Sequence, residues 1–243
     1  MIDGKRVLII MPAWNEADGV ADVIKEVHTT LPGVDVLVVD DGSVDETSAV
    51  ARAAGATVMT LPYNLGVGGA MRAGYRYAHD RGYDVAIQVD ADGQHDPRNV
   101  PELLERLDQA DLIIGARFAG TGEYETRGPR KWAMVVLAFW LSRMARSKLT
   151  DVTSGFRACN RDLINVFARW YPVEYLGDTV ESTIAVVRAG YRIDQVPVSM
   201  RPRTTGTPSQ SPWKATLYLG RIGMILLLAL SRRSELGPAK QGR

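Results

Sequence analysis

Short apolar runs alternate with amphipathic stretches through the first half of the chain, and this alternation restricts the fold more than any other feature of the sequence. Four runs of about five residues predict strands at Val7 to Met11, Val34 to Val39, Thr57 to Leu61 and Val85 to Val89, and a weaker run follows at Leu112 to Gly115. Each run is apolar on both faces, which is typical of a parallel sheet covered by helices.

The stretches between these runs have the spacing of helices. Apolar residues recur at helical intervals in Val20 to Val27 and in Leu103 to Leu107, and Asp45-Glu46-Thr47 places acids at the positive end of a helix dipole. We therefore expect an α/β fold with an open, doubly wound, mostly parallel sheet flanked by helices. In such sheets, ligands bind beyond the carboxyl ends of the strands.

Composition excludes several classes of protein. Lys and Arg number 29 against 28 Asp and Glu, so the chain lacks the overall basic charge that would suggest nucleic-acid binding, and we expect no nucleic-acid partner. The single cysteine, Cys159, excludes a disulfide within the chain and an all-cysteine metal site, and we expect it to be a small core residue. No long apolar stretch precedes the strand at Arg6 to Met11, so we expect no signal peptide and a cytoplasmic location.

Polar residues follow three of the predicted strands. They are Pro12-Ala13-Trp14-Asn15-Glu16, Asp40-Asp41-Gly42-Ser43-Val44-Asp45 and Asp90-Ala91-Asp92-Gly93-Gln94-His95. Each group alone could be a turn or a helix cap. Because carboxyl ends of parallel strands meet at one edge of a sheet, we interpret the three groups together as one binding site.

Asp90 and Asp92 flank a single residue, so both carboxylates can face one hard cation that is also held by substrate phosphates. We expect Mg²⁺ or Mn²⁺, with Gln94 as a further oxygen ligand. Such an ion would neutralise the charge that develops on a diphosphate leaving group. His95 could be a ligand or base, but beside Asp96-Pro97 it is more typical of a surface turn.

The glycine-rich stretch Asn64 to Ala70 precedes a predicted helix. Its glycines would allow either a close backbone approach to a ligand or tight packing of the helix. The stretch lacks the Walker lysine and the dinucleotide-fold spacing, which disfavours phosphate-binding loops of those two classes.

Pro12 to Glu16, Val38 to Ser43, Asn64 to Gly66 and Gln88 to Gln94 resemble, in order and spacing, the successive motifs of glycosyltransferase family 2. Two further segments, Gly115-Ala116-Arg117 and Asp151-Val152-Thr153-Ser154-Gly155-Phe156-Arg157, are similar to those of the polyprenol-phosphate and dolichol-phosphate sugar synthases, the group that includes dolichol-phosphate mannose synthase. The resemblance covers roughly residues 5 to 210.

The resemblance implies a GT-A fold and a UDP- or GDP-sugar donor. We assign nucleotide binding to Pro12, Ala13, Trp14, Asn15, Glu16, Asp40, Asp41, Gly69, Asp90 and Ala91. Metal binding is assigned to Asp90, Asp92 and Gln94. Two positions depart from the family pattern: Val67 stands where many relatives carry Lys, and Gly177-Asp178 stands where an acidic pair is common. The donor sugar and the role of Asp178 therefore stay open.

Charge is distributed unevenly in the second half of the chain. Thr126 to Thr150 and Gln195 to Ser234 each contain six Lys or Arg and no carboxylate, and they include the apolar runs Trp132 to Leu141 and Ile222 to Leu230. These runs are shorter than the roughly 20 residues that span a bilayer. We interpret them as amphipathic helices at an anionic membrane interface. The alternatives are a core helix for the first run and, for the second, a helix that packs on a partner such as a membrane-anchored subunit.

These basic segments favour a lipid-phosphate acceptor. We expect Arg117, Arg130, Ser154 and Arg203 to bind the acceptor phosphate, since arginine can grip phosphate oxygens with two hydrogen bonds. The predicted reaction transfers a sugar to a polyprenyl phosphate with inversion, at the inner face of the plasma membrane. We assign catalytic roles to Asp92 and Arg117, and to Asp178 if the acceptor is a hydroxyl.

Two residues keep alternative roles. If the acceptor were a neutral hydroxyl, Asp178 would be the general base; otherwise it caps a helix that carries Val180, Ile184 and Val187 on one face. Asp151 would either position the acceptor or cap a turn.

The sequence also predicts a division of the chain. Residues 1–211 would form the GT-A domain, with a nucleotide-binding half of about 1–117 and an acceptor-binding half of about 118–211. Residues 212–243 would form an amphipathic helix and tail that contacts the membrane or a partner.

Overall fold

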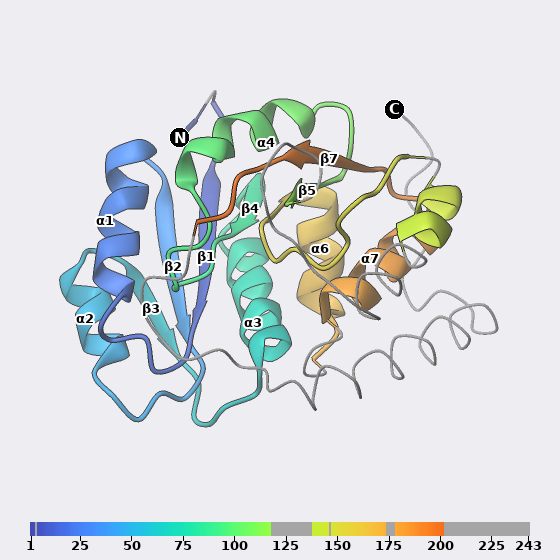
Figure 1. The fold of residues 1–243 in the computed structure, drawn as a ribbon. Coiled ribbons are helices and arrows are strands. Elements are labelled where there is room, and N and C mark those ends of the chain that lie inside the picture. The colour runs from blue at the N-terminus through green and yellow to red at the C-terminus, as the bar shows by residue number, and fades with distance from the viewer. Residues whose placement is uncertain (3, 118–137, 146, 174–177, 202–243) are drawn as a thin grey trace.

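The computed structural model describes residues 1–2, 4–117, 138–145, 147–173 and 178–201, and these form a three-layer sandwich of helices, sheet and helices (Figure 1). The α/β fold expected from the sequence is confirmed. Arg130, Arg203, the run Ile222 to Leu230 and the predicted tail at 212–243 lie outside the described residues.

A seven-stranded sheet forms the middle layer. Its strands are β1 (Val7–Ala13), β2 (Asp35–Asp40), β3 (Thr57–Thr60), β4 (Val85–Gln88), β5 (Leu112–Ala116), β6 (Arg157–Asn160) and β7 (Ile193–Pro197). Their order across the sheet is β3-β2-β1-β4-β6-β5-β7. The strand β6 runs antiparallel to both of its neighbours, β4 and β5, and every other neighbouring pair is parallel. The mostly parallel sheet predicted from the apolar runs is therefore confirmed.

The five predicted strands all form, with ends that differ from the apolar runs by a residue or two. Most are buried on both faces, because helices cover both sides of the sheet. The exception is β3, where Thr57 and Thr60 are exposed and Val58 and Met59 are only half-buried. The prediction that this run is buried on both faces was wrong, because β3 is an edge strand of the sheet.

Helices cover the sheet on both faces. One face carries α1 (Val20–Thr30), α2 (Thr47–Ala53) and α4 (Val100–Arg106), which follows the short 3₁₀ helix η1 (Pro97–Asn99), and the other carries α3 (Val67–Asp80), α6 (Arg161–Arg169) and α7 (Asp178–Arg188). The helix start predicted at Asp45 is confirmed, since a carboxylate oxygen of Asp45 accepts the Thr47 backbone N–H at 3.0 Å. Cys159 is buried, as expected.

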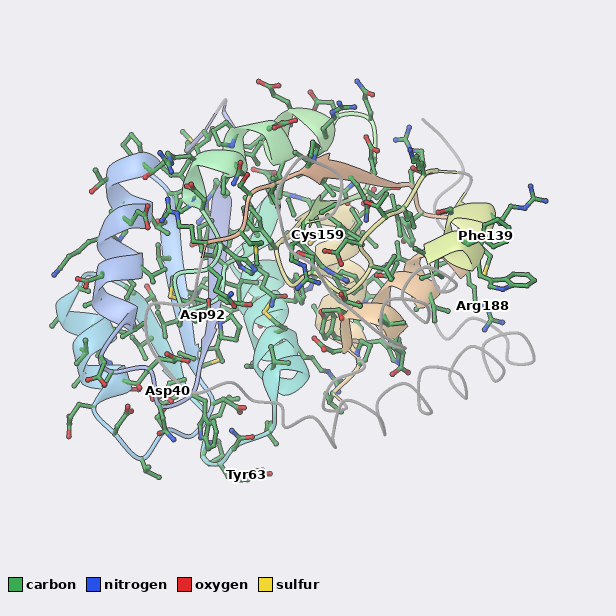
Figure 2. All side chains as sticks on the ribbon, viewed as in Figure 1. Asp40, Tyr63, Asp92, Phe139, Cys159 and Arg188 are labelled. Carbon is green, nitrogen blue, oxygen red and sulfur yellow. The ribbon has the colours of Figure 1, made fainter. Side chains whose placement is uncertain are left out.

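The predicted apolar run Trp132 to Leu141 is described only from residue 138, where a helical segment covers 138–145. Leu141 of this segment is buried in the core and Ala138 is buried as well, whereas Phe139 and Trp140 are 62% and 53% exposed. Figure 2 shows Phe139 projecting from the end of the molecule far from Asp40 and Asp92. None of the helices in the described ranges has the length and apolar character needed to cross a membrane.

Candidate active site

The loops after β1 and β2 hold one another at the carboxyl edge of the sheet. Asn15 has a positive φ of 55°, which is uncommon for a residue other than glycine. Its conformation is stabilised by two bonds to the β2 loop: its N–H donates to Ser43 Oγ at 2.9 Å, and its Oδ1 accepts the Val44 N–H at 2.9 Å. The adjacent Trp14 is 54% exposed. The predicted nucleotide-binding group Pro12 to Glu16 thus runs from the end of β1 into a fixed turn with an accessible aromatic ring.

Asp40 and Asp41 are both buried and both hold backbone. An oxygen of Asp40 accepts the Ser43 N–H at 2.9 Å. The two oxygens of Asp41 accept the N–H groups of Leu65 at 2.7 Å and Gly66 at 2.8 Å. Burial raises the pKa of Asp41, although these two N–H donors oppose the rise. These carboxylates fix the loops after β2 and β3; their contact with a nucleotide stays a prediction.

The glycines before and within α3 allow close packing. A Cβ on Gly68 would lie 2.2 Å from the carbonyl oxygen of Pro172, and a Cβ on Gly69 would lie 2.5 Å from Leu65 Cβ. Of the two readings of this stretch, the structure supports tight helix packing. The nucleotide-binding role assigned to Gly69 stays a prediction.

The Asp90 loop begins where β4 ends. Asp90 Oδ1 accepts a hydrogen bond from Gln88 Nε2 at 3.0 Å, and an oxygen of Asp92 accepts the Gln94 N–H at 3.0 Å. The Asp90 side chain is 36% exposed, whereas Asp92 is buried. Asp92 and Asp40 lie in the region of the molecule where β1 and β2 end (Figure 2).

The donor set at this loop fits a hard cation shared with a substrate. Asp90 and Asp92 supply carboxylate oxygens, and Gln94 uses its side-chain nitrogen to approach the Arg201 carbonyl oxygen at 3.4 Å, which leaves its Oε1 for other partners. Within the described part of the chain, no three His, Cys, Asp or Glu side chains are grouped as metal ligands. Few protein ligands are typical of Mg²⁺ sites that complete their coordination with phosphate oxygens and water.

His95 is a buried residue, and the prediction of a surface turn was wrong. The residue is only 2% exposed, and its ring stacks on Phe156 with centroids 5.0 Å apart and an angle of 17° between the planes. The backbone N–H of Asp90 donates to His95 Nδ1 at 3.0 Å. The turn-like sequence around His95 gives no sign of this contact, because Phe156 is distant in the chain.

Arg117 follows β5 and is held by Asp151. Arg117 Nε donates to Asp151 Oδ2 at 2.7 Å, and Nη2 donates to Asp151 Oδ1 at 3.1 Å and to Thr153 Oγ1 at 2.6 Å. Burial tends to raise the pKa of Asp151, but the hydrogen bonds and charge of Arg117 outweigh it, so this pKa is lowered. Asp151 also accepts the Thr153 N–H at 3.1 Å. It therefore caps a turn, one of its two predicted roles, and fixes the plane of the guanidinium.

Residues 151–156 connect two centres of the site, the carboxylate centre at Asp90 and the arginine centre at Arg117. At one end of this segment Asp151 holds Arg117, and at the other a Cβ on Gly155 would lie 3.3 Å from Asp90 Oδ2. Ser154, between them, is buried, and its Oγ accepts the Phe156 N–H at 3.3 Å. The acceptor-binding role assigned to Ser154 stays a prediction.

Asp178 lies at the start of α7 and is 4% exposed. Its Oδ2 has no hydrogen-bond partner among the described residues. Burial raises the pKa of this carboxyl to about 6, against the opposing charge of Arg157, and the charge of Asp90 raises it further. Val180, Ile184 and Val187 are buried, which confirms the predicted apolar face of this helix.

Sequence reasoning missed Gln88, Arg157 and Arg201. Arg157 is buried and donates to the carbonyl oxygens of Ser154 at 2.7 Å and Val152 at 2.8 Å. For Gln88 the available signal was a polar side chain inside the apolar run Val85 to Val89, a position where an unpartnered polar group is uncommon. Arg157 gave no such signal, because its strand was not recognised in the sequence.

Arg201 joins the Asp90 loop to α1. Its guanidinium donates to Glu26 at 2.8 Å and pairs with Asp96 at 2.8 Å, and its backbone N–H donates to the Gln94 carbonyl oxygen at 3.1 Å. Arg98 first, and Arg201 in addition, lower the pKa of Asp96 to about 2. The segment that leaves β7 is therefore fixed to the loop that carries the predicted metal ligands.

Comparisons with known proteins identify the family. The family model described as glycosyl transferase family 2 matches residues 8–167. The chain is 35% identical over 219 residues to an undecaprenyl-phosphate mannosyltransferase of Micrococcus luteus, covering 85% of this chain and 88% of that protein. It is 31% identical over 224 residues to a polyprenol monophosphomannose synthase of Mycolicibacterium smegmatis, covering 85% and 82%.

Solved structures share the fold. Glucosyl-3-phosphoglycerate synthase from Mycobacterium tuberculosis, in complex with Mn²⁺, UDP and phosphoglyceric acid, superposes with a TM-score of 0.71 at 20% identity, over 98% of this chain and 81% of that one. The expected GT-A architecture is thereby confirmed.

Proposed function

The chain belongs to glycosyltransferase family 2, and from that premise we propose that it transfers a sugar from a UDP- or GDP-sugar to a polyprenyl phosphate. The observation that carries this proposal is the segment 151–156, which connects a carboxylate centre at Asp90 with an arginine centre at Arg117. Such a reaction brings the diphosphate of the donor close to the phosphate of the acceptor. The Asp90 centre would bind the donor diphosphate through a cation, and Arg117 would bind the acceptor phosphate. Two relatives support the same acceptor class, since their names specify undecaprenyl phosphate in one case and a polyprenol in the other.

On the donor side, Asp90, Asp92 and Gln94 would hold Mg²⁺ or Mn²⁺, which supplies positive charge against the diphosphate leaving group. The loops fixed by Asp40 and Asp41 would form the wall against which the nucleoside lies. The related fold of glucosyl-3-phosphoglycerate synthase was solved with Mn²⁺ and UDP, which is consistent with this arrangement.

On the acceptor side, an oxygen of the lipid phosphate attacks the anomeric carbon as the bond from that carbon to the nucleoside diphosphate breaks. A phosphate monoester is largely dianionic at neutral pH, because its second pKa is near 6, so the attack needs no general base. Arg117 would orient this phosphate, with its guanidinium plane held by Asp151. Arg130, Ser154 and Arg203 remain the other predicted contacts.

Asp178 supports a second candidate function, transfer to a hydroxyl group. An inverting transfer to a hydroxyl benefits from a carboxylate base, and Asp178 is a buried carboxyl whose pKa is raised to about 6 and which senses the charge of Asp90. The replacement Asp178→Asn separates the two functions. Transfer to lipid phosphate should survive it, whereas transfer to a hydroxyl should fall by about 10²–10⁴-fold.

The direct experiment supplies the purified protein with Mg²⁺ or Mn²⁺, a panel of radiolabelled UDP- and GDP-sugars, and a synthetic polyprenyl phosphate. We expect label in the lipid phase from one donor, and none when EDTA is added or when Asp92 is replaced by Asn. Label appearing only in saccharides or small alcohols would refute the lipid acceptor and favour the second function.

We also propose that the helical segment 138–145 contacts the membrane that holds the acceptor, at its cytoplasmic face. Phe139, Trp140 and Met144 are exposed on it beside the exposed Arg143, a combination suited to an anionic lipid interface. A membrane-anchored partner subunit for residues 212–243 stays an alternative prediction.

Sedimentation with phosphatidylglycerol-containing vesicles tests this contact. Replacing both Phe139 and Trp140 by Ala should lower the bound fraction by on the order of tenfold or more, since burying one large apolar side chain contributes about 1.5–3 kcal/mol. Tyr63→Ala is the matched control, because Tyr63 is 64% exposed and lies away from Phe139 (Figure 2). Equal loss in both variants would contradict the proposal.

A further inference from the structure

We infer that His95 is a positioning residue that fixes the orientation of Asp90 through one defined tautomer of its ring. This inference rests on the proposed metal-dependent transfer and adds a residue to it. In this role His95 orients the Asp90 carboxylate and does not itself bind the metal.

The tautomer follows from the hydrogen bond to the backbone. The Asp90 N–H is a donor only, so His95 Nδ1, 3.0 Å away, must carry the lone pair that accepts it. The ring hydrogen therefore lies on Nε2. This nitrogen is 3.7 Å from Asp90 Oδ2, a distance too long for a direct hydrogen bond but one that directs the positive end of the N–H dipole toward the carboxylate.

The ring has little freedom to leave this arrangement. His95 is 2% exposed and Phe156, on which it stacks, is completely buried. His95 thus accepts the backbone N–H of Asp90 and directs its Nε2–H toward the Asp90 side chain.

Asp90 is supported from a second direction by Gln88. Gln88 is itself 2% exposed, and its Nε2 donates to Asp90 Oδ1 at 3.0 Å. Each carboxylate oxygen therefore faces one polar hydrogen of the protein, from Gln88 or from His95. The Asp90 side chain is still 36% exposed, so its outer edge can meet a cation without the carboxylate rotating.

Gln88 and His95 matter for metal binding because a carboxylate that is already oriented loses less conformational freedom when it binds a metal ion. Replacing such outer partners typically weakens metal binding by about 10- to 100-fold. The two functions of His95 can also be separated by chemistry, since Asn places an acceptor near the position of Nδ1, Gln reaches the position of Nε2, and Phe keeps only the stacking ring.

The experiment measures Mn²⁺ binding to the purified full chain by electron paramagnetic resonance, with Mn²⁺ alone and with UDP or GDP added. His95→Phe should weaken binding by about 10- to 100-fold, His95→Asn should recover most of that affinity, and His95→Gln should recover less. His28→Phe on α1 is the matched control and should bind as the wild type does. Thermal unfolding of each variant separates loss of affinity from loss of folded protein.

Two results would overturn the inference. Equal Mn²⁺ affinity in the folded His95 variants and the wild type would show that the ring does not position Asp90, even if sugar transfer is metal-dependent. A wild type that binds no Mn²⁺ with either nucleotide would instead refute the metal dependence on which the inference rests.

A second measurement needs no variant that folds poorly. The chain has three histidines, so long-range ¹⁵N–¹H spectra at neutral pH can resolve each ring. The His95 ring should show a nitrogen with a lone pair at δ1 and a protonated nitrogen at ε2. The opposite tautomer would contradict the geometry from which the inference starts.

Discussion

Replacing Asp178 by Asn should stabilise the protein more at pH 8 than at pH 4.5. Burial raises the pKa of this carboxyl to about 6 in the folded state, whereas an aspartate in an unfolded chain has a pKa of about 3.9. Between these values the folded state keeps a proton that the unfolded state releases, so the wild type loses stability as the pH rises through this window. Asparagine resembles the protonated carboxyl and has no such proton to lose.

The two pKa values set the size of the effect. The two values give a loss of about 3 kcal/mol in the free energy of unfolding of the wild type as the pH rises through the whole window. About 2 kcal/mol of this loss falls between pH 4.5 and pH 8. Urea unfolding followed by circular dichroism, with EDTA present, measures the free energy of unfolding at both pH values. The stability of Asp178→Asn relative to the wild type should rise by about 2 kcal/mol from the lower to the higher pH.

Asp96→Asn is the matched control. Arg98 and Arg201 lower the pKa of Asp96 to about 2, below the pH window of the experiment, so its replacement should change stability by nearly the same amount at both pH values. If the Asp178 variant shows the same constant offset as the Asp96 variant, burial does not raise the pKa of Asp178 and the reasoning fails.

Three further predictions concern other buried groups. Gly155→Ala would place a Cβ against the Gln88 side chain, which donates a hydrogen bond to Asp90. This replacement should weaken Mn²⁺ binding about tenfold, as measured by calorimetry, and an unchanged affinity would contradict the prediction. Asp151→Asn removes the buried carboxylate of the Arg117–Asp151 ion pair and should lower the urea-unfolding free energy by about 3 kcal/mol; a loss below about 1 kcal/mol would contradict the stabilising role of this pair. Burial raises the pKa of the Cys159 thiol to about 12, so a thiol reagent should label it only after unfolding, and rapid labelling of the native protein would count against its burial.

The sequence predicted β1, β2, β4 and β5 because these parallel strands are continuous apolar runs, and burial on both faces leaves that signal. It missed β7, which pairs parallel with β5 and has Asp194 and Gln195 within the strand. It did not identify β6, since Arg157 and Asn160 interrupt the pattern of this short strand. Its position depends on pairing with strands that are distant in the chain, which no local window contains.

In the site as well, some features follow from residues that are neighbours in the sequence, and others depend on residues that are distant in the chain. The proximity of Asp90 and Asp92, and the divalent cation expected between them, follow from their spacing, and the resemblance to a known family added the nucleotide-sugar donor. The burial of His95 depends on Phe156, and the use of Asp41 to hold Leu65 and Gly66 depends on where the β3 loop lies. Carboxylates that look available in a sequence can be engaged by the backbone of the same chain.

The antiparallel strand β6 has a consequence for how the protein is made. It lies between β4 and β5, and begins at Arg157, well after both of them in the chain. While the protein emerges from the ribosome, β4 therefore presents an unpaired edge and β5 has no route into the sheet until residue 160 is available. A truncated chain that ends near residue 117 should expose that edge and aggregate, so we expect that residues 1–117 do not fold by themselves.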